Sequence, residues 1–324
     1  MKTVVTESPA EASRFIRDGG IVAFPTETVY GLGADVFNEF SIAKVFAAKE
    51  RPADNPLIAH VARVSQIERL AGEVPLAALK LIERFFPGPL TLVLPKADEV
   101  PPIATAGLET IGVRMPGDPL TREFLSACSS PVVAPSANIS GKPSPTTWQA
   151  VLEDLDGRID CVLKGEPSQH GLESTVVDCT SDTPIVLRPG AITLEQLREI
   201  ITETAPYSGD ESGEARSPGM KHKHYSPRAN VALGEIDEAG KVSLLQAQAF
   251  SDDPSECAFI GIHSPTEEFA LEKIVGTLEE YARELFEFFR QCDRVGIATV
   301  ICESVEEKGI GVAVMDRIRR AARR

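Results

Sequence analysis

Two cations and an amide follow one another closely in the segment Lys49–Leu57, which reads KERPADNPL. The apolar spacing of residues 42–46 predicts a helix just before it, and the two prolines are expected to stop that helix and extend the chain. Lys49 would offer a mobile point charge, Arg51 a flat fork of donors suited to phosphate oxygens, and Asn55 a neutral donor and acceptor. The alternative is that both cations only compensate the dipole of the helix end.

A third cation, Arg114, lies in the short apolar segment TIGVRMP, residues 110–116. An arginine among apolar neighbours is costly to bury unless its charge is paired. We therefore expect Arg114 either to meet a carboxylate, such as Glu27 or Asp118, or to face an anionic ligand. The sequence leaves both alternatives open.

Hydroxyl-rich loops follow two of the predicted strands. The first is PTETVYGLG, residues 25–33, and the second is APSANISGKPSPT, residues 134–146. Short polar side chains and free backbone N–H groups suit an anion without adding bulk, and ligands of open α/β sheets bind at strand ends. The second loop lacks the spacing of a P-loop, and polar turns without a ligand are the alternative for both.

Helical and strand periodicity disappears over residues 206–228, whose composition is typical of a linker. Within it, SPGMKHKHYSP, residues 217–227, concentrates histidine, lysine and tyrosine. His222 and His224 lack a neighbouring cysteine or carboxylate, which argues against a metal site. We expect instead a segment that folds over a nucleotide.

The last predicted helix, residues 310–324, is rich in arginine. The simplest interpretation is a solvated face that compensates the helix dipole, and contact with RNA is the alternative. The arginines are Arg317, Arg319, Arg320, Arg323 and Arg324.

Short strands alternate with helices along the chain, which predicts an α/β fold. The expected helices after the first, at residues 9–18, are one around residues 42–46 that Pro52 stops and those at 65–71, 75–86, 118–128, 147–155, 193–204, 267–292 and 310–324. The expected strands are 21–24, 90–94, 110–116, 131–134, 161–163, 173–178, 185–190, 231–234, 244–250, 258–262 and 295–302.

The composition limits the class of protein. A chain of 324 residues suits two domains, and its net charge of −15 argues against broad non-specific binding of nucleic acid. The 6 cysteines form no CxxC pair, so we expect reduced thiols. With no signal-peptide pattern and no apolar run near the ~20 residues that span a bilayer, we expect a cytoplasmic protein without membrane contact.

Seven segments in this order resemble the threonylcarbamoyl-AMP synthase family in its two-domain form. They are FPTETVYGLG, KERPADNPL, TIGVRMP, APSANISGKPSPT, ESTVVD, LRPGAI and SPGMKHKHYSP. The resemblance implies a YrdC-like catalytic domain over residues 1–205, with an open twisted mixed sheet and helices. A linker at 206–228 would close over the nucleotide site, and residues 229–324 would form a smaller Rossmann-like α/β domain.

The resemblance also implies a reaction and a set of roles. The family joins L-threonine, bicarbonate and ATP, with Mg²⁺ and no tightly bound organic cofactor, into L-threonylcarbamoyl-AMP and pyrophosphate. A partner complex then transfers the threonylcarbamoyl group to tRNA beside the anticodon, and direct tRNA contact is weakly supported. The residues expected to act in catalysis are Lys49 and Arg51. Those expected around threonine are Thr28, His60, Arg114, Ala134 and Ser174. Those expected around ATP are Arg51, Asn55, Thr110, Ser136, Asn138, Ser144, Arg188, His224 and Tyr225.

Two rival functions remain. A carbamoyl transferase of a related maturation pathway would be expected to carry acylphosphatase or zinc-finger modules, which this sequence lacks. A non-enzymatic RNA-binding regulator fits poorly with the acidic net charge. The cluster of side chains suited to phosphate also counts against this regulator.

Overall fold

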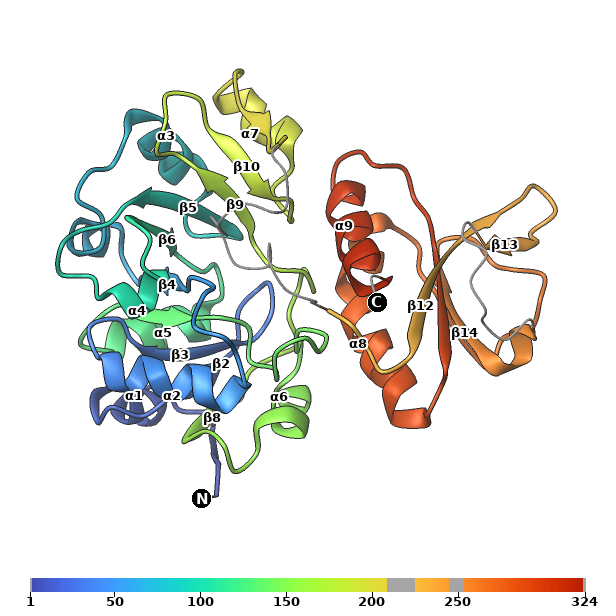
Figure 1. Cartoon of the computed structure of the whole chain (residues 1–324), viewed down its shortest axis with the longest axis horizontal. Coiled ribbons are helices and arrows are strands. Elements are labelled where there is room, and N and C mark those ends of the chain that lie inside the picture. Colours follow the sequence, from blue (N-terminus) through green and yellow to red (C-terminus); the bar gives the residue numbers. More distant parts are fainter. Residues whose placement is uncertain (1, 209–224, 245–252, 323–324) are drawn as a thin grey trace.

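The computed structural model describes residues 2–208, 225–244 and 253–322. Figure 1 shows these residues as two lobes, each built around its own sheet. Helices α8 (Leu278–Val295) and α9 (Gly311–Ala322) of the second lobe lie between its sheet and the first lobe. His224, most of the predicted linker and the end of the predicted strand 244–250 lie outside the described residues, as do Arg323 and Arg324.

The first lobe contains, in its described part, an 11-stranded sheet with the order β1-β8-β2-β3-β7-β4-β6-β5-β9-β10-β11. The sheet contains parallel pairs, such as β4 with β6, and antiparallel pairs, such as β3 with β7, so it is mixed, as expected. The strands are β1 Val4–Thr6, β2 Val22–Phe24, β3 Gly31–Asp35, β4 Ile58–His60, β5 Leu90–Pro95, β6 Thr110–Arg114, β7 Val132–Ala134, β8 Cys161–Leu163, β9 Thr175–Asp178, β10 Ile185–Arg188 and β11 Ala205–Pro206.

Side-chain caps begin most helices of the first lobe, which is why local sequence located them well. Ser8, Asp118 and Thr193 each accept a backbone N–H at a helix start that the sequence predicted. The helices are α1 Pro9–Arg17, α2 Glu39–Lys49, α3 Leu76–Phe85, α4 Pro102–Thr105, α5 Pro119–Ala127, α6 Trp148–Leu155 and α7 Leu194–Ile200, with a 3₁₀ turn η1 at Val64–Arg69.

The second lobe is a smaller α/β unit with the sheet order β13-β12-β16-β14-β15. Its strands pair in parallel except for the edge strand β13, as expected for a Rossmann-like unit. The elements are β12 Asn230–Ile236, β13 Val242–Leu244, η2 Pro254–Glu256, β14 Cys257–Gly261, β15 Leu271–Ile274, α8 Leu278–Val295, β16 Thr299–Glu303 and α9 Gly311–Ala322.

Several predicted boundaries are wrong. Helix α2 ends at Lys49, before the prolines, because Glu50 adopts a left-handed conformation with φ of 53° and caps it. The predicted helix 267–292 begins only at Leu278, since residues 271–274 pair with β14 as an edge strand. The predicted strand 295–302 starts later, at Thr299, because Gly296 at φ 81° ends α8 first.

Other corrections are smaller. In place of the helix predicted over 65–71 there is the 3₁₀ turn η1, Val64–Arg69, and the last predicted helix of the first lobe ends at Ile200 instead of 204. Residues 31–33, taken as the end of a loop, instead begin strand β3, which lies between β2 and β7. A Cβ on Gly33 would lie 2.5 Å from Val132 Cγ1, so glycine permits this pairing.

The two lobes share apolar contacts. Val29 and Leu172 of the first lobe belong to the same buried cluster as Tyr281, Phe286 and Ile318 of α8 and α9. Continuous apolar packing of this kind fixes the position of the second lobe against the first. None of the described helices combines the length and apolarity that crossing a membrane requires.

Candidate active site

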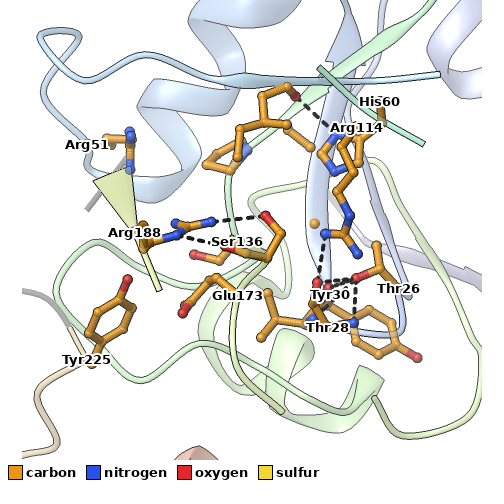
Figure 2. A pocket seen from close by; sticks show the side chains of 16 residues that line it. Thr26, Thr28, Tyr30, Arg51, His60, Arg114, Ser136, Glu173, Arg188 and Tyr225 are labelled. Carbon is orange, nitrogen blue, oxygen red and sulfur yellow. Dashed lines mark hydrogen bonds between the residues drawn. The ribbon is translucent and has the colours of Figure 1, made fainter. Parts of the chain in front are cut away.

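A cavity opens at strand ends of the first lobe (Figure 2), where ligands of open α/β sheets bind. Parallel pairing of β4 and β6 sets His60 beside Arg114 at their carboxyl ends. The lining residues are Thr26, Thr28, Val29, Tyr30, Gly31, Arg51, Ile58, His60, Arg114, Ala134, Pro135, Ser136, Glu173, Ser174, Arg188 and Tyr225.

Arg114 is paired with a carboxylate, the first of its two expected environments, and it also lines the cavity. Its Nη2 lies 2.7 Å from Glu27 Oε1, and its Nη1 donates to Thr28 Oγ1 at 2.8 Å. Burial would raise the pKa of the Glu27 carboxyl, but the charge of Arg114 holds that pKa below its usual value. Nη2 carries two hydrogens and the pair with Glu27 uses one, so the other can still donate to a ligand carboxylate.

His60 lines the cavity beside Arg114 with an uncharged side chain. Its ring Nδ1 lies 3.0 Å from the Ile58 carbonyl oxygen, and the ring meets Phe24 edge-on at 5.6 Å between centroids. Burial, with the nearby charge of Arg114, lowers the pKa of His60 to about 3. The imidazole is therefore uncharged at neutral pH and acts by shape and hydrogen bonding.

Arg188 and Arg51 lie across the cavity from Arg114 (Figure 2). Arg188 is held by Ser174, whose carbonyl oxygen and hydroxyl accept from Nε and Nη2 at 3.1 and 3.2 Å. Within the described chain, the hydrogen bonds of Arg51 are long, 3.2 and 3.4 Å from Nη2 to the carbonyl oxygens of Asn55 and Pro56. Burial lowers the pKa of Arg51 to about 10, so its guanidinium is still charged at neutral pH.

Lys49 does not line the cavity, and the expectation of a mobile charge at this position is wrong. It is 1% exposed, and its Nζ lies 2.5 Å from the carbonyl oxygens of both Ser136 and Asn138. Burial lowers the pKa of this ammonium well below its usual value. Lys49 therefore fixes the loop that follows β7, and Ser136 of that loop lines the cavity.

Some of the other predicted residues lie next to residues that line the cavity, and others lie away from it. Asn138 holds its own loop by donating to the carbonyl oxygens of residues 139 and 142, and Ser144 donates to Glu173 at 2.5 Å. Asn55 is buried, and within the described chain its side-chain amide has no hydrogen-bond partner. Thr110 lines a separate small hollow beside Ile58.

Sequence reasoning missed two charged residues. Glu173 lines the cavity, and Arg317 of α9, interpreted as solvated, is 0% exposed and lies 2.9 Å from Glu173 Oε2. The sequence carried part of the signal for the burial of Arg317, because this residue lies at helical spacing from Ala313, Val314 and Ala321, which are buried. That Arg317 meets Glu173 depends on how the second lobe packs against the first, which the helical spacing does not show.

The chain matches known proteins along nearly its full length. Residues 14–190 match a family model described as "Telomere recombination", and residues 192–323 match one described as "Threonylcarbamoyl-AMP synthase, C-terminal domain". A threonylcarbamoyl-AMP synthase of Pyrococcus abyssi is 46% identical over 319 residues, which is 96% of this chain and 93% of that protein. The synthase of Bacillus subtilis is 41% identical over 321 residues, covering 97% of this chain and 92% of its own.

A solved structure agrees with the sequence relatives. The crystal structure of P. abyssi Sua5 complexed with L-threonine has a TM-score of 0.88 to this fold and 41% identity, covering 99% of this chain and 97% of that chain. Both lobes are therefore shared with it, together with their relative placement. On its sequence, its domains and its fold, the chain belongs to the threonylcarbamoyl-AMP synthase family.

Proposed function

We propose that this protein joins L-threonine, bicarbonate or CO2, and ATP into L-threonylcarbamoyl-AMP, with release of pyrophosphate. The observation that carries the proposal is the division of one cavity into two cationic halves. Arg114, Thr28 and His60 lie on one side, and Arg51, Arg188 and Tyr225 lie on the other (Figure 2). A zwitterionic amino acid fits the first half, and a polyphosphate fits the second.

The half around Arg114 is proposed to hold threonine. Its Nη2 would donate to the substrate carboxylate in a charge-assisted bond, while Glu27 keeps the arginine in place. Ser174 Oγ, which shares a hydrogen bond of 2.8 Å with Thr91 Oγ1, borders the same hollow. The relative of known structure that was solved with L-threonine supports this assignment.

The half around Arg51 and Arg188 is proposed to hold ATP. Planar guanidinium groups suit phosphate oxygens, and Ser136 adds a hydroxyl from the loop that Lys49 fixes. The threonine amine would attack bicarbonate or CO2 to form a carbamate. A carbamate oxygen would then attack the α-phosphorus, and pyrophosphate would leave. Such a step depends on alignment and charge neutralisation rather than on a protein nucleophile, and it makes this protein a nucleotidyltransferase.

Mg²⁺ would arrive with ATP, because this ion usually binds through substrate phosphates and retains several waters. The described residues contain no group of three His, Cys, Asp or Glu side chains that could hold a metal. Glu173 is a carboxylate in the wall of the proposed nucleotide half. The product would pass to a transferase complex that modifies tRNA.

Pyrophosphate release from ATP tests the proposal. We expect release to require both threonine and bicarbonate and the adenylate product to carry label from both. Serine in place of threonine is the matched control, because it lacks only a methyl group. Release that is indifferent to threonine would refute the synthase, and turnover that instead depends on carbamoyl phosphate would identify the rival carbamoyl transferase.

A further inference from the structure

Arg317 reaches from the second lobe to the wall of the cavity. It lies on α9, is 0% exposed, and its Nε donates to Glu173 Oε2 at 2.9 Å. Its Nη2 donates to the Pro189 carbonyl oxygen at 3.1 Å, and its guanidinium carbon lies 5.3 Å from the centroid of the Tyr225 ring. Glu173 and Tyr225 both line the cavity, so a residue of the second lobe supports the proposed nucleotide half directly.

Glu173 presents an electrostatic problem for a polyanion. Its carboxylate is 7% exposed and accepts from Ser144 Oγ at 2.5 Å. Burial raises the pKa of this carboxyl, but the charges of Arg317 and Arg188 outweigh it and hold the pKa below its usual value. The group is therefore a permanent anion in the wall of a site for phosphates, and without a counter-charge it would repel them.

The second lobe is fixed firmly enough to supply that counter-charge. Arg290 of α8, 4% exposed, donates to the Pro143 carbonyl oxygen at 2.6 Å and to Asp154 Oδ2 at 2.8 Å. A Cβ on Gly171 would lie 2.4 Å from the Cα of Arg283, so the backbones of the two lobes touch there. With the shared apolar cluster, these contacts allow Arg317 little freedom.

We infer that Arg317 is a positioning residue that neutralises Glu173 and so keeps the nucleotide half of the cavity receptive to ATP. This inference rests on the proposed function. It gives the second lobe a role in the reaction, because its helix α9 completes the wall of a site whose other charged groups lie in the first lobe. Threonine binding, at the far side of the cavity, should be insensitive to Arg317.

The test compares R317M with E173Q/R317M in the full-length chain. R317M is expected to raise KM for ATP at least tenfold and to leave KM for threonine within twofold. The double variant removes the uncompensated anion and is expected to return KM for ATP to within fivefold of wild type. If R317M does not fold, the double variant alone decides the test. A KM for ATP at least tenfold above wild type in the double variant would then overturn the inference.

Two controls separate charge compensation from general destabilisation. R319M removes an arginine from the same helix, but one whose side chain is 45% exposed and pairs only with Glu307 among described residues. V300A weakens the core of the second lobe, where Val300 is 0% exposed, without changing any charge. Both variants should keep KM for ATP within twofold of wild type. If V300A raised KM for ATP as much as R317M does, the inference would be overturned.

The outcome is distinguishable from failure of the proposed function. If wild type shows no threonine-dependent release of pyrophosphate, the proposed synthase is wrong, and the Kd for a non-hydrolysable ATP analogue replaces KM. A tenfold higher Kd in R317M that returns towards wild type in E173Q/R317M would then support the role inferred for Arg317. An unchanged Kd in R317M, or no binding by wild type, overturns the inference.

Discussion

Replacing Arg51 by alanine should reduce activity far more than stability. Its protein contacts are long, 3.2 and 3.4 Å, and its Nε has no hydrogen-bond partner among the described residues. Net contributions of hydrogen bonds are about 0.5–1.5 kcal/mol even with good geometry. The charge of Arg51 also disfavours the buried ammonium of Lys49, so removing it relieves repulsion. We expect the free energy of unfolding to change by less than about 1 kcal/mol.

The activity should respond differently. A hydrogen bond to a charged group contributes about 1.5–3 kcal/mol, and each ~1.4 kcal/mol corresponds to a factor of ten. Loss of one phosphate contact in R51A is therefore expected to lower kcat/KM for ATP by roughly 10- to 100-fold. R51K keeps the charge without the fork and should fall between R51A and wild type.

Threonine-dependent release of pyrophosphate and urea denaturation at pH 7.5 measure the two effects on the same preparations. R122A is the matched control, because Arg122 is an exposed arginine on α5. It should leave kcat/KM and the free energy of unfolding unchanged. If R51A loses stability in proportion to activity, or loses neither, Arg51 serves the fold or the helix dipole and the assignment to ATP is wrong.

Three further changes probe neighbouring groups. R114M leaves the buried Glu27 carboxylate unpaired, which should cost about 3–5 kcal/mol of unfolding free energy. In wild type the pKa of Glu27 is lowered, so its pairing stabilises the fold above the ordinary pKa of the carboxyl and is lost as pH falls through the lowered value. In R114M burial raises that pKa, so urea denaturation should show a larger deficit at pH 8 than at pH 5, and an equal deficit would contradict the pairing. K49M leaves two buried carbonyl oxygens without their donor and should lower Tm and raise KM for ATP together, at a cost of about 1–3 kcal/mol; a change in only one would show that the ammonium does not fix this loop. G33A places a methyl group 2.5 Å from a side chain of the neighbouring strand and should destabilise by about 1–3 kcal/mol, whereas wild-type stability would mean that β3 can shift.

Local patterns located most of the elements and much of the cavity. The caps at Ser8, Asp118 and Thr193 and the strand ends after residues 24 and 134 were visible because they depend on neighbours in the sequence. The structure brings Thr28, Arg114, Ser136 and Arg188 into one cavity. Strand ends that meet at one edge of a sheet explain why motifs far apart in the sequence converge.

Errors arose where distant segments decide the outcome. Lys49 was expected to face a ligand, but the loop after β7 supplies two carbonyl oxygens to its ammonium. Residues 271–274 were expected to be helical, but pairing with β14 makes them a strand. The expected contact of Thr110 with ATP stays a prediction, but its place beside Pro95, in a hollow other than the cavity, is likewise set by strand pairing. Each outcome depends on atoms more than ten positions away, which no local pattern contains.

The sequence alone determined the family resemblance, the α/β class, the order of the motifs and the cations available for phosphate. Only the tertiary structure decided which cations face the cavity, which support its loops, and that Arg317 of the second lobe pairs with Glu173 of the first. The physical reason is the range of the interactions. Caps, turns and periodicity act over a few residues, whereas the environment of a charge is set by whatever folding packs around it.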